Sequence, residues 1–232
     1  HKLTIMSAIA FGIPVQFDKA YLEGISKLDA QDITYAQQLG YRIKLLGITR
    51  RKANGIELRV HPTLIPQSRL IANVDGVMNA VLVKGDAVGA TMYYGAGAGA
   101  EPTASAVIAD LVDITRLHTA DPDHRVPHLA FQPSQLANLP ILPIEEVETC
   151  YYLRINATDK PGVLADITRI FADAGISIDS MLQKPAPEAR ADIIILTHLA
   201  IEKNVNGALA KIEALDSING KVVKLRLEHL QG

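Results

Sequence analysis

The sequence contains one cysteine, no tryptophan and no long run of charged or apolar residues. The single thiol, Cys150, cannot form an internal disulfide, which favours a reducing compartment such as the cytoplasm. The 23 basic and 25 acidic residues nearly balance, and they show none of the cationic clustering that binds nucleic acid or an anionic membrane. Apolar runs such as 193–196 are far shorter than the ~20 residues of a membrane-spanning helix. The composition therefore predicts a cytoplasmic protein with neither nucleic acid nor a membrane as partner.

The start of the chain also lacks a capping residue and a signal-peptide pattern. His1 and Lys2 lead directly into apolar residues at helical spacing. These residues are Leu3, Ile5, Met6, Ile9 and Ala10. Because helices usually begin after a Ser, Thr, Asp or Asn cap, we expect the natural protein to extend upstream of His1.

A chain of 232 residues with 48% hydrophobic residues is large enough for two domains. Five prolines interrupt residues 121–148, which excludes regular structure there and indicates a linker. The same stretch carries apolar residues, so we expect it to lie on a protein surface. The predicted organisation is a first domain at 1–120, a linker at 121–148 and a second domain at 149–232.

The first domain shows a sequence of helix and strand patterns. A short helix begins after Asp29 and ends at Gly40, and a strand covers about 41–50. Asn54-Gly55 predicts a tight reversal into an alternating second strand. Two further strands, at 80–84 and 91–94, precede a glycine-rich loop and a helix that begins near Pro102. The stripe expected to face the core on that helix is Val107, Leu111, Ile114 and His118.

The second domain reads strand, helix, strand, strand, helix, strand. These elements are expected at 151–158, 163–174, 176–183, 192–200, 205–215 and 223–228. The order is that of the ferredoxin-like split βαβ arrangement. The stretch 193–196 is apolar at every position, so both faces of that strand need a cover. We expect another domain or the linker to supply it, and we expect the chain to form at least a dimer.

Two short motifs of the second domain resemble ACT regulatory domains. They are Asp159-Lys160-Pro161-Gly162-Val163-Leu164 and Ala174-Gly175-Ile176-Ser177-Ile178. The first motif alone is also compatible with a plain capped turn, but the βαββαβ frame around it favours a ligand site. The resemblance implies an amino-acid effector, L-threonine in our interpretation, bound where glycine admits a carboxylate to free helix amides. The effector contacts implied are Asp159, Gly162, Val163 and Leu164, with Ile178, Ser180 and Gln183 from an adjacent second strand.

Three segments of the first domain resemble homoserine dehydrogenases. They are His1-Lys2-Leu3-Thr4-Ile5 leading to Ala10-Phe11-Gly12, then Asn73-Val74-Asp75-Gly76-Val77-Met78-Asn79-Ala80-Val81, and Gly95-Ala96-Gly97-Ala98-Gly99 with Pro102-Thr103-Ala104-Ser105-Ala106-Val107. The fold class implied is α+β, a substrate domain of mixed sheet and helices followed by a ferredoxin-like ACT domain. The activity implied is interconversion of L-homoserine and L-aspartate 4-semialdehyde in threonine, methionine and isoleucine biosynthesis.

The homoserine dehydrogenase resemblance assigns three residues to the active site. Lys2 matches the family's proton-transfer lysine, and Gly99 and Thr103 match positions that meet the nicotinamide end of NADP or NAD. Gly95, Gly97 and Ala100 have dinucleotide-binding spacing, but no second strand ending in an acidic residue follows. We therefore expect this chain alone to be inactive and to bind the cofactor weakly or not at all. The complete protein is expected to be a homo-oligomer.

The remaining reactive residues suggest no further site. His124 and His128 have metal-compatible spacing but no third ligand, so we expect no metal. His61 and His198 lie on strand patterns and are expected to be structural or surface residues, and Cys150 is expected to be a buried or linker thiol. The alternative from another functional class is a non-enzymatic amino-acid sensor whose first domain only dimerises.

Overall fold

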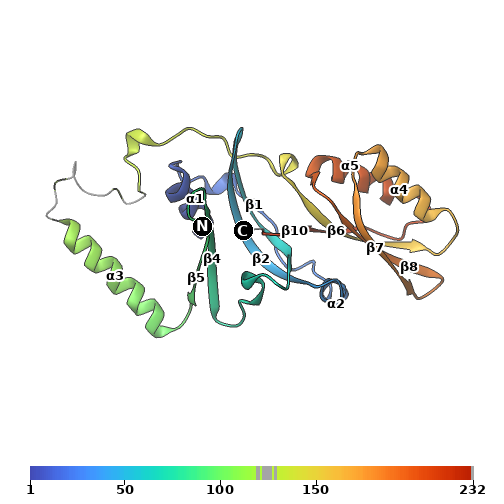
Figure 1. The fold of residues 1–232 in the computed structure, drawn as a ribbon, viewed down its shortest axis with the longest axis horizontal. Helices are drawn as coiled ribbons and strands as arrows, with labels where there is room; N and C mark the ends of the chain where they lie inside the picture. The colour runs from blue at the N-terminus through green and yellow to red at the C-terminus, as the bar shows by residue number, and fades with distance from the viewer. Residues whose placement is uncertain (119–120, 122–126, 128–129, 231–232) are drawn as a thin grey trace.

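The computed structural model describes residues 1–118, 121, 127 and 130–230. The molecule is elongated, with α3 at one end and α4 and α5 at the other (Figure 1). The amino-terminal segment contains α1 (Lys2–Phe11), β1 (Tyr21–Leu22), α2 (Ala30–Gln38), β2 (Tyr41–Lys52), β3 (Gly55–Pro66), β4 (Met78–Gly85), β5 (Gly89–Ala96) and α3 (Ala100–His118). The carboxy-terminal segment contains β6 (Glu148–Thr158), α4 (Val163–Asp173), β7 (Ile178–Ala186), β8 (Arg190–Thr197), β9 (Ala200–Ile201), α5 (Glu202–Glu213) and β10 (Val223–Leu227). Short 3₁₀ turns are η1 (Phe17–Lys19), η2 (Leu70–Asn73), η3 (Pro133–Gln135) and η4 (Ile144–Glu146).

The carboxy-terminal segment has the predicted βαββαβ order. Its strands lie in the order β10-β6-β8-β7 with antiparallel neighbours, which is the ferredoxin-like arrangement. The second strand begins two residues later than expected, since Ile176 packs into the core after the left-handed Gly175. The expected strand at 192–200 is divided. Its main part is β8, while Ala200 and Ile201 pair with the start of β6 as β9.

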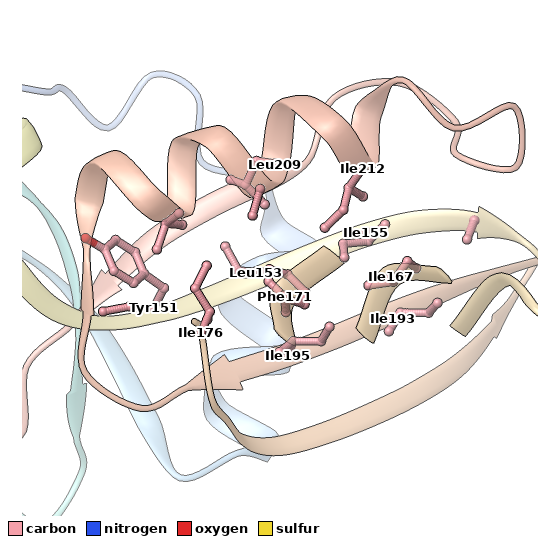
Figure 2. Close-up of a cluster of buried hydrophobic side chains, with 14 of the residues drawn as sticks. Tyr151, Leu153, Ile155, Ile167, Phe171, Ile176, Ile193, Ile195, Leu209 and Ile212 are labelled. Atoms are coloured by element: carbon pink, nitrogen blue, oxygen red, sulfur yellow. The ribbon is translucent and has the colours of Figure 1, made fainter. Parts of the chain in front are cut away.

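One face of this sheet packs against α4 and α5. Alternate residues of β6 and β8 point to that face, as a pleated strand requires. Figure 2 shows these side chains meeting apolar residues of the two helices in a single layer. The fully buried members include Tyr151, Leu153, Ile155, Ile167, Phe171, Ile195, Val205 and Ile212. This core holds the start of α4 against β6 and β8.

The opposite face of the sheet packs against α2 of the amino-terminal segment. Ile194 and Leu196 of β8 point to this side, where Tyr35 and Ala36 of α2 cover them. The two apolar faces of the 193–196 strand are thus both buried within one chain, and this strand does not require a second copy. Cys150 lies in the same cluster, and burial raises the pKa of its thiol. The expected buried thiol is confirmed.

The last strand joins the two segments into one sheet. β10 pairs with β6 on one side and in parallel with β3 on the other, where Arg226 is opposite Thr63. β3 also forms the predicted long antiparallel hairpin with β2, so the sheet has eight strands. Residues 140–142 of the linker lie along this sheet, where the Ile56 amide donates to the Pro140 carbonyl at 2.9 Å and the Leu142 amide donates to the Ile56 carbonyl at 2.8 Å. The pairing with β3 covers the outer edge of β10, which would otherwise be an exposed edge strand of the ferredoxin-like sheet.

Charged side chains are buried at the seam between β3 and β10. Arg226, 2% exposed, donates to Glu202 of α5 at 2.6 and 2.8 Å and to Glu23 at 2.8 Å. Arg59 of β3 donates to Glu228 at 2.7 Å. Burial alone would lower the pKa of Arg226 and raise that of Glu202. The ion pair outweighs burial in both cases, raising the arginine pKa and lowering the carboxyl pKa. The seam is therefore a compensated ionic network.

His61 sits inside this network and predicts a pH-dependent stability. Burial, followed by the charges of Arg226 and Arg59, lowers its pKa to about 4. The pKa of a histidine in an unfolded chain is about 6.5. Between pH 6.5 and pH 4 the unfolded chain therefore binds a proton at His61 while the folded chain does not, and this favours unfolding. The free energy of unfolding should fall by about 2 kcal/mol between pH 7 and pH 5 through this group. Urea unfolding at both pH values measures it, with His61→Gln as the comparison. Equal pH dependence in the two proteins would contradict the assignment.

Many apolar side chains of α1 and α3 are exposed. In α1 the buried residues include Leu3 and Ala8, whereas Ile5, Met6 and Ile9 are 37–45% exposed. The prediction of a core-facing stripe on α3 is wrong for the described chain, because α3 has no buried residue and stands apart from the large sheet (Figure 1). Its Leu111 is 53% exposed. β4 and β5 form a separate two-stranded sheet with exposed apolar residues, among them Tyr93 and Tyr94.

Candidate functional site

The turn between β6 and α4 exposes backbone donors. Gly162 precedes the helix with φ of 95°, a left-handed conformation that favours glycine, and a Cβ added there would meet nothing within 4 Å. The amides of Leu164 and Ala165 fall in the first turn, where no intrahelical acceptor exists. No side-chain cap covers this end of α4. The turn therefore offers free N–H groups and the positive end of a helix dipole to an anion.

A cavity of about 340 Å³ opens at this turn. Five of the predicted effector residues line it: Asp159, Gly162, Val163, Leu164 and Gln183. Thr158, Lys160, Pro161, Ala191 and Ile193 complete the lining. Lys160 and Pro161 belonged to the motif already, whereas Ala191 and Ile193 come from β8, whose register with β6 no local pattern specified. Ile178 and Ser180 lie elsewhere on β7 and do not line the cavity.

Both signs of charge flank the cavity. Asp159 accepts a hydrogen bond from the Gln183 amide at 3.2 Å, which fixes its carboxylate at the mouth. Lys160 and the α4 amides lie on the same rim, and Val163 and Ile193 supply an apolar wall. An ammonium can be paired with Asp159 while a carboxylate faces the helix amides. The cavity can therefore hold a small zwitterion with a short side chain.

Lys2 stands at the first position of α1 and is exposed. Its neighbours are firmly placed: Leu3 packs on Gly47 of β2, and the Thr4 hydroxyl donates to the His1 carbonyl at 2.7 Å. Within the described residues, the Lys2 side chain makes no hydrogen bond or ion pair. The ammonium is thus placed by the α1–β2 contact but has no partner in this part of the chain.

The glycine-rich loop before α3 forms an open backbone surface. A Cβ at Gly97 would collide with the Asn79 side chain, so this glycine lets β4 and the loop approach each other closely. Gly99 has φ of 122°, and its carbonyl accepts from the Thr103 amide at 3.2 Å. Gly99 and Thr103 are exposed at the start of α3. The loop therefore presents backbone groups and the Thr103 side chain to solvent.

The structure does not join the predicted active-site residues to one another. No hydrogen bond or ion pair among the described residues connects Lys2 with Gly99 or Thr103. His124 and His128 lie outside the described residues, and the described part of the chain contains no group of three metal-ligating side chains. None of its helices is long and apolar enough to cross a membrane.

Two family models match separate segments of the chain. The homoserine dehydrogenase family model matches residues 1–112, and the ACT domain model matches residues 151–217. The chain is 62% identical to the homoserine dehydrogenase of Pseudomonas aeruginosa, over 99% of this chain and 54% of the relative. The identity with the enzyme of Neisseria gonorrhoeae is 59%, covering 99% and 53% respectively.

A solved structure has the same fold. The crystal structure of a homoserine dehydrogenase from Thiobacillus denitrificans superposes with a TM-score of 0.93 at 72% identity, covering 100% of this chain and 52% of that one. The chain thus spans about half the length of the relatives it matches. It is a member of the homoserine dehydrogenase family, a family of nicotinamide-dependent oxidoreductases, and it carries an ACT domain after its homoserine dehydrogenase segment.

Proposed function

We propose that the complete protein interconverts L-homoserine and L-aspartate 4-semialdehyde with NADP(H) or NAD(H). In this proposal the present chain supplies part of the substrate side of the active site and a regulatory ACT domain that binds L-threonine. The observation that carries the proposal is the homoserine dehydrogenase match over residues 1–112, followed by an ACT domain with an open cavity at its first turn. The same match disfavours the alternative of a non-enzymatic sensor.

Lys2 is the proposed proton-transfer residue. A nicotinamide nucleotide, when bound, exchanges a hydride with the terminal carbon of the substrate, and the substrate hydroxyl must lose or regain a proton. The Lys2 Nζ can take and return that proton if a neighbour or burial tunes its pKa. Gly99 and Thr103 hold the nicotinamide end through the exposed loop before α3. The remaining walls of the site then come from parts of the protein that this chain does not include.

Replacing Lys2 tests this role in the complete protein. We expect Lys2→Ala to lower kcat for homoserine oxidation about 100-fold or more, the scale typical of a lost general base. The Michaelis constant for the nucleotide should change little, because Lys2 is not assigned to its binding. Steady-state kinetics measure both constants, and Lys19→Ala, on the exposed turn η1, is the matched control. Wild-type kcat in Lys2→Ala would remove Lys2 from the mechanism.

L-Threonine is the proposed effector, and energetics show what the cavity must supply. A dissociation constant of about 0.1 mM corresponds to ~5.5 kcal/mol. A helix terminus gives an anion only about 0.3–2 kcal/mol, so Asp159, Lys160 and burial of the side-chain methyl must add the rest. L-Serine lacks that methyl and should bind about fourfold more weakly, since ~0.8 kcal/mol is lost. Calorimetric titration of both amino acids measures the ratio, and tighter serine binding would contradict the apolar wall.

A neighbouring copy is proposed to complete the cavity. β7 is the last strand of the sheet, and no strand of the described residues pairs with its outer edge. That edge is therefore open to a strand of another copy. Side-by-side pairing there would bring Ile178 and Ser180 of one copy toward the cavity of the next. A solution mass above that of one 25.1 kDa chain supports the pairing, and a strictly monomeric chain at tens of micromolar contradicts it.

A further inference from the structure

Asp192 of β8 is a buried carboxylate that faces the amino-terminal segment. It is 2% exposed. Its Oδ2 accepts from the Gln31 amide at 2.6 Å and from the Tyr35 hydroxyl at 3.1 Å, both on α2. Its Oδ1 accepts from Asn156 of β6 at 2.8 Å. Because a buried carboxylate is costly without donors, these contacts fix the position of β8 relative to α2.

The neighbours of Asp192 along β8 line the effector cavity. Ala191 and Ile193 point to the opposite face of the sheet, as strand alternation requires, and both belong to the cavity wall. A shift of β8 that widens or narrows the cavity therefore moves Asp192 in the same step. One face of β8 thus forms part of the cavity wall through Ala191 and Ile193, and its other face contacts α2 through Asp192.

α2 is attached to this sheet by a second buried contact. Asp32, fully buried, accepts from Arg154 at 2.6 and 2.9 Å and from the Tyr152 hydroxyl at 2.9 Å. α2 continues into β2 after two residues. β2 in turn carries Gly47, on which Leu3 of α1 packs beside Lys2. Contiguous contacts thus run from the effector cavity to the proposed proton-transfer lysine.

We propose that Asp192 and α2 transmit occupancy of the effector cavity to the amino-terminal segment. This inference rests on the proposed effector site. Asp192 acts as a positioning residue: an amino acid seated against Ala191 and Ile193 stabilises one setting of β8, and the Gln31 and Tyr35 contacts impose that setting on α2. Linkage then requires that weakening these contacts changes effector affinity.

Hydrogen exchange of the α2 amides in this chain tests the link without any substitution. Saturating L-threonine should slow exchange at 33–38 by about fivefold or more, the scale of a modest coupling free energy. In the double variant Gln31→Leu/Tyr35→Phe the threonine-induced change should disappear, and calorimetry should show a dissociation constant raised about fivefold. Thr34→Ala, at an exposed α2 position whose hydroxyl donates to the Ala30 carbonyl of the same helix, should behave as wild type.

The outcomes separate the link from the effector site. Threonine binding by the wild-type chain with unchanged α2 exchange overturns the link and leaves the site. A double variant that keeps both the wild-type affinity and the exchange response also overturns it. If the wild-type chain gives no heat with millimolar L-threonine, the effector site fails and the link fails with it. Circular dichroism of the double variant checks that the sheet is retained.

Discussion

Replacing Arg226 by methionine is expected to lower the free energy of unfolding by about 3 kcal/mol or more. Methionine keeps about the length of the apolar part of the arginine side chain but removes the guanidinium. Glu23 then loses its ion pair with Arg226, and Glu202 keeps only its ion pair with Lys224 among the described residues. The loss of one partner from a buried ion pair leaves a desolvated charge, which costs more than the pair contributed. Urea unfolding followed by circular dichroism measures the change.

A surface arginine of the same domain provides the control. Arg190 pairs with Glu188 at 3.0 Å, but these side chains are 42% and 72% exposed. Arg190→Met should therefore change the free energy of unfolding by no more than about 1 kcal/mol. Comparable losses in the two variants would mean that the seam is hydrated in solution and that the network around Arg226 does not hold β10 in place.

Gly162→Leu is expected to abolish L-threonine binding by the ACT domain. The added side chain would stand at the mouth of the cavity, beside the free amides of α4, where the carboxylate is proposed to lie. A 100-fold loss of affinity corresponds to about 2.7 kcal/mol, within what a blocked contact with the amides and the apolar wall can account for. Calorimetry of both proteins gives the ratio of dissociation constants.

Gly162→Ala is the matched control for this variant. Both substitutions place an L-residue at φ of 95°, so they share the backbone strain, while alanine leaves most of the cavity open. We expect Gly162→Ala to bind threonine more tightly than Gly162→Leu. Equal and complete loss in the two variants would trace the effect to the turn conformation, and unchanged binding in Gly162→Leu would place the effector elsewhere.

The ferredoxin-like part of the fold was predictable because its signals are local. Alternation in 151–158, helical spacing from Val163 and the stop at Gly175 each specify one element, and the βαββαβ order then leaves one common arrangement. The hairpin at Asn54-Gly55 has the same local character. The errors lie at the ends of elements, such as the start of β7, where Ile176 packs into the core, and in the division of the expected strand at 192–200.

The seam between the segments was not predictable, because its partners are far apart in sequence. Arg226 meets Glu23 across 203 positions, and Arg154 meets Asp32 across 122. As isolated residues, each of these charges resembles an ordinary surface side chain. The β10–β3 pairing likewise depends on two edges that only the folded segments bring together.

The candidate site was predictable to different degrees on its two sides. The β6–α4 turn is one continuous motif, so Asp159 and Gly162 were identified directly, whereas the β8 wall required the strand register. Lys2 and Gly99 are assigned to the active site only through resemblance, since no spacing pattern in the sequence indicates a role for either residue. The stripe of α3 was misassigned because helical periodicity identifies an apolar face but not what covers it.

We propose that the protein carrying this chain is a homoserine dehydrogenase controlled through its ACT domain. The most direct measurement is the rate of NADPH or NADH formation by the complete protein with L-homoserine, with and without millimolar L-threonine. We predict that L-homoserine drives the formation of NADPH or NADH. L-Threonine should slow this rate in the wild type and leave it unchanged in Gly162→Leu. Failure to form either reduced nucleotide with L-homoserine would contradict the enzymatic claim, and a wild-type rate unaffected by L-threonine would contradict the regulatory one.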